Sequence, residues 1–343
     1  MKMKDKINVC LIGCGRAGMI HARSYNGNVA GAQLIAICDP FEENLKTAQA
    51  ELNVKYQYTD YNDVLLNDEV DAIVVVTPTQ FHKDIVVAAA NAGKHVFCEK
   101  PMAGSAEECD AMIEACKANN VKLQLGFMRR FDESFQKGKE IIENKQVGEV
   151  TMIKSLTHGP SEPKAWMFDI SDSAGPIGEV NSHDLDTLRW YAGSEVKMIH
   201  AIGRNFRSPE IASDYPDYYD TCAVLLEFEN GVLGMVDGAQ YVQYGYDARA
   251  EILGTHGIAK VGCQKNNNVE LVTKEKLLHT DSMPSWTKLY KDAYIAEAKA
   301  FVEAIQNDTE TEVTGYDGKM ALILVQEGLK SLLEKRPVYI GEE

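Results

Sequence analysis

The segment Ile7–Gly18, which reads INVCLIGCGRAG, limits what this chain can fold into more than any other stretch. Its first six residues, Ile7–Ile12, are mostly apolar, as expected of a buried parallel strand, and they lead into the pattern Gly13-x-Gly15-x-x-Gly18. The first glycine permits a tight turn, the second lets the backbone approach phosphates, and the third lets a helix pack close to the strand. The start of that helix would present free N–H groups to an anion. The segment therefore predicts a binding site for the pyrophosphate of a dinucleotide.

Asp39 closes a second apolar strand, Gln33–Cys38, about 20 residues after Gly18, where an acidic residue bonds the hydroxyls of the adenosine ribose. Because Pro40 follows and no arginine is adjacent, a 2′-phosphate would meet only a repelling carboxylate. We therefore expect NAD rather than NADP as the cofactor. The alternative interpretation of the whole segment is an ordinary turn between a strand and a helix.

The composition restricts the class of protein. The 343 residues suggest two domains, and the 45% of hydrophobic and 25% of charged residues are typical of a globular protein. The net charge of −16 argues against nucleic acid and anionic membranes as partners, since both attract basic surfaces. No apolar run approaches the ~18 residues of a membrane span. No signal peptide is expected, because the first apolar run stops at Gly13 without a small-residue cleavage site.

The eight cysteines form no C-x-x-C pair and no disulfide spacing, so we expect them to be reduced, small core residues of a cytoplasmic protein. The eight histidines are scattered, without an H-x-x-x-H pair or a cluster with cysteine, and no metal site is expected. The G-x-S-x-G motif of serine hydrolases is absent from the sequence.

Strand and helix patterns alternate through the first third of the chain. The expected strands are 7–12, 33–38, 55–58, 72–76, 95–98 and 121–125, and the expected helices are 41–52, 61–66, 81–92 and 106–119. Continuous apolar strands that alternate with helices predict a doubly wound parallel sheet. We therefore expect an α/β dinucleotide-binding domain at residues 1–126.

The pattern changes near Gly126, where strands begin to follow one another. After a helix expected at 131–144, the expected strands are 149–156, 197–204, 221–229, 232–241, 248–254 and 258–261, and helices 290–306 and 317–334 precede a short strand at 338–340. The dipeptide Asn230-Gly231 is a strong hairpin signal. Residues 127–343 are therefore expected to form a second domain on an open, largely antiparallel sheet. The tyrosine-rich run 214–220 is expected to be a loop that lines either a site or only the surface.

A more specific pattern joins the glycine turn to TPTQFH at 77–82 and to Glu99-Lys100-Pro101 at the end of a strand. Together these motifs resemble the glucose–fructose oxidoreductase / inositol dehydrogenase (Gfo/Idh/MocA) family, closest in motif to its inositol 2-dehydrogenases. The resemblance covers nearly the whole chain, including YIAEAKAFVEAIQ and VTGYDGKMAL. It implies an N-terminal Rossmann domain, a C-terminal α/β domain for substrate binding and oligomerisation, NAD as cofactor, and a homo-oligomer, either dimer or tetramer.

Lys100 would lie at the carboxyl end of a parallel strand, where open α/β sheets place their ligands. The resemblance implies that this lysine touches the reacting hydroxyl, where a fixed ammonium favours negative charge developing on the oxygen. Pro101 stiffens the turn that aims the lysine. The alternative is a solvated loop lysine paired with Glu99.

The segment Phe127–Asp132, FMRRFD, resembles the form seen in inositol dehydrogenases, which implies that Met128 and Arg129 lie beside the substrate. The alternative is a linker between domains whose arginines pair with nearby acidic residues.

Glu179 and His183 are spaced i, i+4, so we expect them on one face of a helix, with Asp186 and Trp190 continuing the stripe. A carboxylate one turn from a histidine can hold the ring and raise its basicity. The alternative is a plain helix-surface pair, but the segment resembles the family's D-x-x-x-H-x-x-D segment, whose Asp and His contact substrate and handle its proton. Inositol dehydrogenases carry Asp where this chain has Glu179, so the resemblance supports the reaction more strongly than the identity of the polyol.

The chain is therefore predicted to be an NAD-dependent dehydrogenase that oxidises a secondary hydroxyl of a cyclic polyol or sugar by hydride transfer. The catalytic candidates are Lys100, His183 and Glu179, the first two being alternative bases, and Met128 and Arg129 complete the substrate set. The expected cofactor-binding residues are Gly13, Gly15, Arg16, Ala17, Gly18, Asp39, Thr77, Pro78, His82, Glu99 and Lys100. His82 is expected near the nicotinamide, with packing at a helix start as its alternative.

Two other functions stay open at the level of the sequence. One is a sugar or glycoside dehydrogenase, or an aldose reductase, of the same family. The other is a sugar-sensing regulator that uses the fold without chemistry, which the presence of both Lys100 and His183 disfavours.

Overall fold

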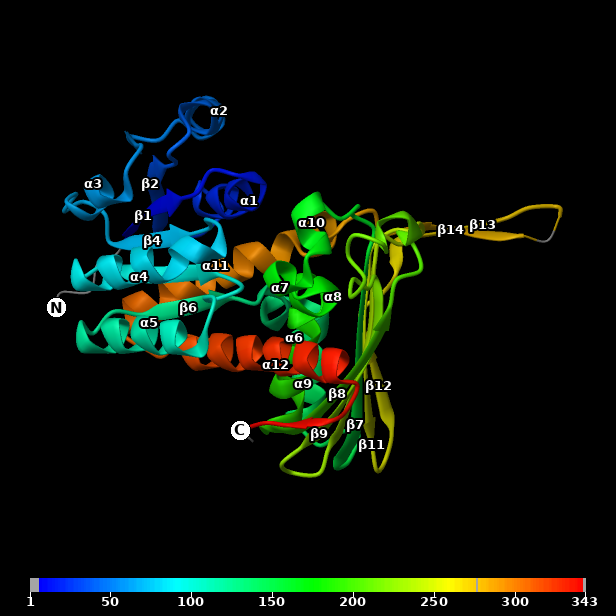
Figure 1. Cartoon of the computed structure of the whole chain (residues 1–343). Helices are drawn as coiled ribbons and strands as arrows, with labels where there is room; N and C mark the ends of the chain where they lie inside the picture. Colours follow the sequence, from blue (N-terminus) through cyan, green and yellow to red (C-terminus); the bar gives the residue numbers. More distant parts are fainter. Residues whose placement is uncertain (1–5, 276, 342–343) are drawn as a thin grey trace. The chain divides into compact units, whose positions relative to one another are not determined.

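The computed structural model describes residues 6–275 and 277–341, which divide into two compact units (Figure 1). The first unit runs to Asp132 and also contains Lys291–Leu322, whereas the second consists of Glu133–Tyr290 and the chain from Ile323 onward. One segment from late in the sequence, Lys291–Leu322, therefore belongs to the first unit, although the sequence pattern placed the whole of 127–343 in one domain. The division at residues 126 and 127 stays a prediction about functional domains.

The first unit is built on a parallel sheet. Its strands are β1 (Ile7–Ile12), β2 (Ala32–Cys38), β3 (Tyr56–Tyr58), β4 (Ala72–Val75), β5 (His95–Glu99) and β6 (Leu123–Gly126). Among the described residues the sheet has the order β3-β2-β1-β4-β5-β6, so the strand order reverses between β1 and β4. This confirms the doubly wound sheet expected from the sequence, and ligands of such sheets bind at the carboxyl edge near the reversal.

Helices cover both faces of this sheet. They are α1 (Arg16–Tyr25), α2 (Glu42–Leu52), α3 (Tyr61–Leu65), α4 (His82–Asn91), α5 (Ala106–Ala118) and α11 (Lys291–Asn307). Successive residues of β1 enter two different apolar clusters, Leu11 one and Ile12 the other, because side chains alternate between the faces of a strand. Phe301 of α11 belongs to the cluster of Leu11 and packs its ring 6.0 Å from that of Phe97. This burial explains why α11 joins the first unit.

The second unit is built on a mixed sheet. Its strands are β7 (Val150–Gly159), β8 (Val196–Arg204), β9 (Thr221–Phe228), β10 (Leu233–Gln240), β11 (Asp247–Gly254), β12 (Ile258–Val261) and β15 (Val338–Tyr339). The described strands have the order β12-β11-β7-β10-β9-β8-β15, and only β7 and β10 pair in parallel. The largely antiparallel sheet expected from the sequence is thus confirmed.

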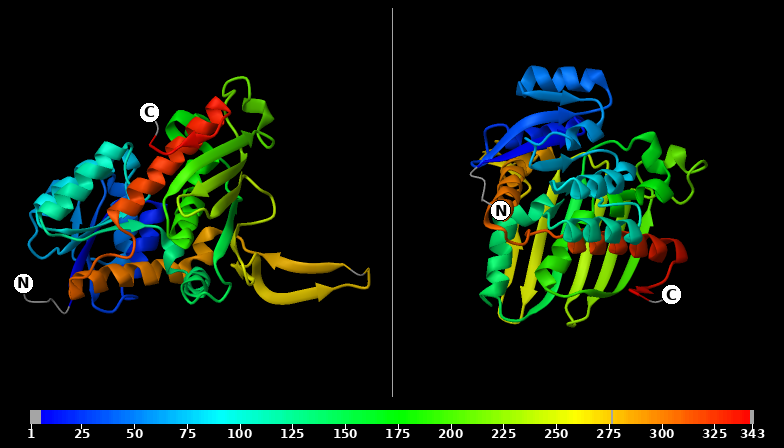
Figure 2. Two further views of the ribbon diagram at one scale, coloured as in Figure 1. Left: turned by 90° about the horizontal axis from the view of Figure 1, so that it is seen from below. Right: turned by 90° about the vertical axis from the view of Figure 1, so that its left-hand side faces the viewer.

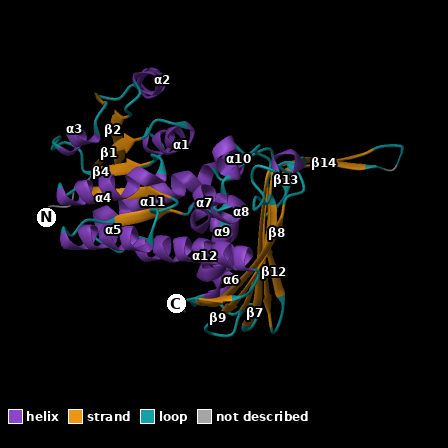
Figure 3. Ribbon diagram, viewed as in Figure 1, coloured by secondary structure: helices purple, strands orange, loops and turns teal. Residues whose placement is uncertain are grey.

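The two faces of this second sheet differ (Figure 3). The described helices of the unit, which include α6 (Glu133–Glu143), α7 (Ile170–Ser173), α8 (Gly175–Glu179), α9 (Ser182–Ala192) and part of α12 (Gly315–Glu334), lie on one side. The strand register places large apolar side chains on the other face, exposed by 43% to 61%: Ile202, Leu225, Leu233, Leu253 and Ile258. We call this the open face.

Two further strands, β13 (Lys265–Val272) and β14 (Leu278–Ser282), form an antiparallel ribbon that projects from the second sheet (Figure 2). The sequence did not predict this ribbon. Nearly all its side chains are exposed on both faces, so the sequence carries no alternation between buried and exposed positions. A short helix, α10 (Trp286–Leu289), follows the ribbon.

All eight cysteines are free, and seven of them are buried as expected. Cys263 is exposed, so the prediction that every cysteine is a core residue is wrong for this position. Cys263 follows β12 by two residues, outside the apolar part of the sheet.

Candidate active site

The turn between β1 and α1 has the shape that a pyrophosphate requires. Gly13 has φ of +99°, and a Cβ on it would lie 2.4 Å from the carbonyl oxygen of Val76. Gly15 is the N-cap of α1 and has no side chain with which to cap the helix, and no heavy atom lies within 4 Å of where a Cβ would be. An open position in front of the first N–H groups of a helix fits a phosphate that approaches the backbone. Arg16 and Ala17 form the first helical turn beside it.

Asp39 closes β2 next to this turn and is only 4% exposed. One carboxylate oxygen accepts from the Cys14 N–H at 2.8 Å, and the other accepts from Phe41 N–H at 2.9 Å and Asn44 Nδ2 at 3.1 Å. A carboxylate has about four acceptor positions. About one is therefore left for a ribose hydroxyl, and Asp39 also fixes the glycine turn, a role that the sequence did not reveal.

Lys100 follows β5 at the same carboxyl edge. Its backbone N–H donates to Glu99 Oε2 at 2.9 Å, and Glu99 Oε1 lies 2.7 Å from Nε2 of His21 in α1. Burial alone would raise the pKa of Glu99, but the hydrogen bond and charge of His21, together with Lys100, outweigh it and lower this pKa. The Glu99 carboxylate is therefore an anion held between α1 and the lysine's own backbone.

His82 begins α4 and is 1% exposed. Its Nδ1 lies 2.9 Å from the Pro101 carbonyl oxygen, and its Nε2 lies 2.8 Å from that of Thr77. Burial lowers the pKa of His82, although both carbonyls oppose this shift. The ring is thus enclosed between two turns, and this geometry favours packing at a helix start over direct contact with a nicotinamide.

The remaining candidates of the first unit lie along the same edge. Thr77 and Pro78 follow β4, the strand between β1 and β5. Met128 and Arg129 follow β6 in a 3-10 turn and are both buried. Since these strands are parallel, their carboxyl ends meet at one edge, and the fold gathers there every predicted site residue of this unit. The neighbouring Arg130 pairs with Asp317 at 3.1 Å, as the alternative interpretation of this segment expects.

Glu179 and His183 lie in the second unit, and the prediction that they share one helix is wrong. Glu179 is the last residue of α8, and His183 is the second residue of α9. The helical conformation is interrupted at Val180 and Asn181, where the Asn181 N–H donates to the carbonyl of Pro176, five residues back. The regular i, i+4 spacing of a continuous helix therefore does not apply to this pair.

Asp184, next to His183, is a fully buried residue that the sequence analysis missed. Its carboxylate accepts from Ser155 Oγ at 2.5 Å, Thr157 Oγ1 at 2.6 Å and Asn181 Nδ2 at 2.8 Å. Ser155 and Thr157 are alternate residues of β7 and point to the same face. This carboxylate fastens the start of α9, and with it the backbone of His183, to the sheet. Two buried polar residues on one face of a strand, Ser155 and Thr157, would have been a usable signal.

Asp186 is also buried in α9, and Trp190 lies one turn further along this helix.

The tyrosine-rich loop packs against the segment before α8. The Tyr219 hydroxyl donates to the Ala174 carbonyl at 2.7 Å, and the ring of Phe168 lies 5.1 Å from that of Tyr218. The loop therefore packs against the segment that leads into the helix carrying Glu179.

The ends of β7 and β10 hold a second cluster missing from the sequence analysis. His158 Nε2 lies 3.0 Å from Asp237 Oδ1, and its Nδ1 contacts the Tyr244 hydroxyl. The hydrogen bond to His158 lowers the pKa of Asp237. The strand register places His158 and Asp237 on the open face.

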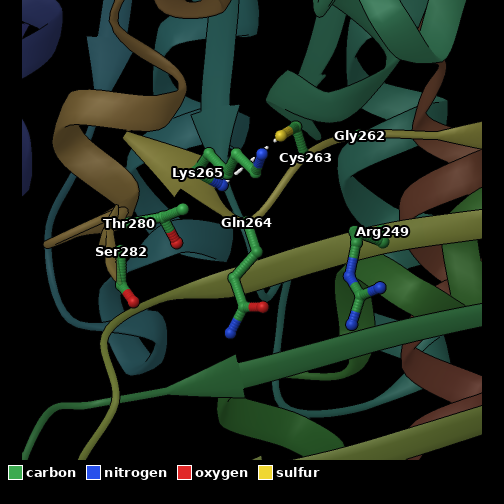
Figure 4. A pocket seen from close by; sticks show the side chains of 7 residues that line it. All are labelled: Arg249, Gly262, Cys263, Gln264, Lys265, Thr280 and Ser282. Atoms are coloured by element: carbon green, nitrogen blue, oxygen red, sulfur yellow. Dashed lines mark hydrogen bonds between the residues drawn. The ribbon is translucent and has the colours of Figure 1, made fainter. Parts of the chain in front are cut away.

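A cavity of about 290 Å³ lies at the base of the β13–β14 ribbon (Figure 4). Its lining residues are Arg249, Gly262, Cys263, Gln264, Lys265, Thr280 and Ser282. Arg249 is paired with Asp247 at 2.8 Å, and Lys265 is paired with Glu270, so both cations are already neutralised. None of the predicted site residues lines this cavity.

Among the described residues, no helix is long and apolar enough to cross a bilayer.

Two family models match the chain. Residues 7–127 match an oxidoreductase family with an NAD-binding Rossmann fold (GFO_IDH_MocA), and residues 135–260 match the GFO/IDH/MocA C-terminal domain. The myo-inositol 2-dehydrogenase of Thermotoga maritima is 35% identical over 98% of this chain and 99% of that protein. The scyllo-inositol 2-dehydrogenase (NAD⁺) of Bacillus subtilis is 31% identical over 93% of this chain and 92% of that protein.

The fold is also shared with solved structures. The scyllo-inositol dehydrogenase of Lactobacillus casei, with bound NAD(H) and scyllo-inositol, has a TM-score of 0.90. It is 28% identical and covers 98% of this chain and 100% of that one. The glycine turn with its open helix start, and the full-length agreement with these proteins, lead to one conclusion: the chain belongs to the GFO/IDH/MocA family of oxidoreductases and binds NAD.

Proposed function

We propose that this chain oxidises a secondary hydroxyl of an inositol-type cyclic polyol with NAD. As a member of the family it is an NAD-dependent dehydrogenase acting on a CH–OH group. The observation that carries the proposal is the position of Lys100, which follows β5 at the edge where the glycine turn follows β1. The proposal for the substrate rests on relatives named inositol dehydrogenases over nearly the full length of the chain.

Each candidate residue has a chemical role in this proposal. The Lys100 ammonium contacts the reacting hydroxyl and stabilises negative charge on its oxygen. His183 takes the hydroxyl proton, and Glu179 and Asp186 orient the hydroxyls of the ring. Met128 and Arg129 complete the substrate site. When bound, NAD supplies the carbon that accepts the hydride.

The cofactor is held by the glycine turn. Gly13, Gly15 and Gly18 admit the pyrophosphate, with Arg16 and Ala17 in the first turn of α1, and Asp39 binds the ribose through its remaining acceptor position. Thr77, Pro78, Glu99 and Lys100 lie toward the reacting end of the cofactor. His82 acts here through the turns that it holds.

We also propose a cytoplasmic homo-oligomer that buries the open face of the second sheet. Exposed apolar side chains on neighbouring strands of this face, such as Leu225 and Leu233, form a patch typical of a subunit interface. The free cysteines suit a reducing compartment.

The proposal is tested by incubating the purified protein with a panel of inositols, hexoses and glycosides and following NADH absorbance, with NAD and NADP compared. We expect kcat/KM to be highest for an inositol, and higher with NAD because Asp39 repels a 2′-phosphate. A hexose or glycoside as the best substrate would replace the inositol assignment. Absence of turnover with every polyol would contradict the proposed function.

A further inference from the structure

Lys100 is flanked by two residues that are each tied to a buried histidine. Glu99, on one side, bonds His21 Nε2 at 2.7 Å, and the carbonyl of Pro101, on the other, lies 2.9 Å from His82 Nδ1. Both histidines are 1% exposed. Neither of them has a part in the proton transfer proposed above, so their burial beside the lysine needs another explanation.

The tie through His21 links the lysine to the pyrophosphate-binding helix. His21 belongs to α1, and its ring is fixed between Phe97 and Tyr294, with centroids 5.0 Å and 5.2 Å away. The His21 ring bonds one oxygen of Glu99, while the other oxygen accepts a hydrogen bond from the Lys100 N–H at 2.9 Å. Both oxygens of the carboxylate are thus hydrogen-bonded, and its orientation is fixed by a residue of α1.

The space around Glu99 is fitted to this arrangement. A Cβ on Gly126 would come within 2.9 Å of the carboxyl carbon of Glu99, so any larger residue there would displace the carboxylate. Glu297 of α11 is buried nearby, and burial together with the charge of Glu99 raises its pKa well above the usual value. This shift favours the neutral form of Glu297 and leaves Glu99 as the carboxylate that bonds His21.

The tie through His82 links the turns after β4 and β5. Its Nδ1 faces the Pro101 carbonyl and its Nε2 faces the Thr77 carbonyl at 2.8 Å. A carbonyl oxygen can only accept, and a neutral imidazole carries a single N–H. The neutral ring therefore donates to one of these turns at a time.

We propose that His21 and His82 are positioning residues that hold Lys100 from both sides and fix it relative to the glycine turn. The catalytic importance of the position of Lys100 rests on the proposed function, whereas the hydrogen bonds through His21 and His82 do not. Displacing a catalytic group by about 1 Å can reduce the rate about 100-fold. The two histidines therefore contribute to turnover without contacting substrate or cofactor.

Three substitutions separate positioning from simple packing. His21→Ala removes the tie to Glu99, and we expect kcat to fall between about 10-fold and 100-fold while KM for NAD changes less than about 3-fold. His21→Gln places an amide N–H where Nε2 was, and it should recover most of the lost kcat. If His21→Ala keeps native kcat, or if His21→Gln is as poor as His21→Ala, the positioning role of His21 is wrong.

His82 offers an internal comparison, because Asn reproduces the position of Nδ1 and Gln that of Nε2. Since the tie to Pro101 is the one adjacent to Lys100, His82→Asn should retain clearly more kcat than His82→Gln. Equal losses in the two variants would contradict the assignment. The control is His95→Gln at the opposite end of β5, where His95 Nδ1 accepts the Lys122 N–H at 3.0 Å. We expect this control to keep native kcat even if it lowers the melting temperature.

A measurement without substrate keeps this inference separate from the proposed function. Hydrogen exchange of the Lys100 amide reports directly on its bond to Glu99. His21→Ala should accelerate this exchange at least about 10-fold, whereas His95→Gln should leave it unchanged. Unchanged exchange in His21→Ala would overturn the inference. An enzyme that oxidises no polyol but shows the accelerated exchange would contradict only the proposed function.

Discussion

At the scale of single residues, the candidate site combines groups of two kinds. Lys100 and His183 have side chains suited to act on a hydroxyl. Asp39 instead holds backbone N–H groups, and Asp184 holds the side chains of β7 and of Asn181. A carboxylate that accepts three internal hydrogen bonds leaves little capacity for a ligand. The two kinds of residue should therefore respond differently to substitution.

Lys100→Ala and His183→Ala should each lower kcat by about 100-fold or more, the usual contribution of a positioned acid–base group. The affinity for NAD should barely change, because the pyrophosphate is held by the glycine turn. Steady-state rates with the best polyol and NADH binding by fluorescence provide the two measurements. Lys46→Ala, at an exposed position of α2, is the matched lysine control and should behave as the wild type. Either residue is excluded from catalysis if its variant keeps near-native kcat.

At the scale of elements, the break between α8 and α9 shows where sequence reasoning stops. The i, i+4 spacing of Glu179 and His183 predicted one helix, but Asn181 bonds Asp184 and packs against Gly238, where a Cβ would come within 2.2 Å of Asn181 Oδ1. Gly238 lies in β10, and the hydroxyls that donate to Asp184 lie in β7, so these contacts come from strands distant in the sequence. A prediction from local periodicity does not include such contacts, so it missed both the break between α8 and α9 and the buried carboxylate of Asp184 beside it.

The anchoring of α9 can be measured through Asp184→Asn. The amide replaces one acceptor oxygen by a donor that faces either the Ser155 hydroxyl or the Thr157 hydroxyl and the Asn181 amide. Leaving buried polar groups unsatisfied costs about 1–3 kcal/mol. Urea unfolding should show this loss in the free energy of unfolding. Asp172→Asn, at an exposed position of α7, should change it by less than about 0.5 kcal/mol. Equal stability of the two variants would mean that Asp184 does not anchor the helix.

Other elements followed from the sequence with little error. The strands β1 and β12 begin and end where the pattern predicted, and most other boundaries agree within one or two residues. The prediction was weaker where burial depends on the fold. The residues of the β13–β14 ribbon show no alternation of apolar and polar side chains. The apolar face of α11 could pack in either domain by its sequence, and only the contact between Phe301 and Phe97 assigns it to the first unit. The roles of the predicted site residues themselves stay predictions.

At the scale of the whole molecule, the open face distinguishes the second sheet from the first, whose two faces are both covered by helices (Figure 1). An apolar patch on an exposed sheet is costly in water unless another surface covers it. A second copy of the chain is the partner that the proposed oligomer requires.

Leu225→Asp places a charge on the open face, where Leu225 is 52% exposed, and should convert the oligomer to smaller species in light scattering. Leu66→Asp is the control, because Leu66 is 80% exposed and belongs to the first unit. An unchanged mass for Leu225→Asp, or an equal change in both variants, would show that the open face is not the interface.

The return of Lys291–Leu322 to the first unit has a consequence for biosynthesis. The cluster around Leu11 and Phe97 remains incomplete until Phe301 is available, and a missing buried Phe costs about 3–5 kcal/mol. On the ribosome, the N-terminal sheet must therefore wait while all of Glu133–Tyr290 is synthesised. The nascent chain exposes an incomplete apolar core during this interval. Its need for chaperones therefore follows from the division of the first unit into two segments of the sequence.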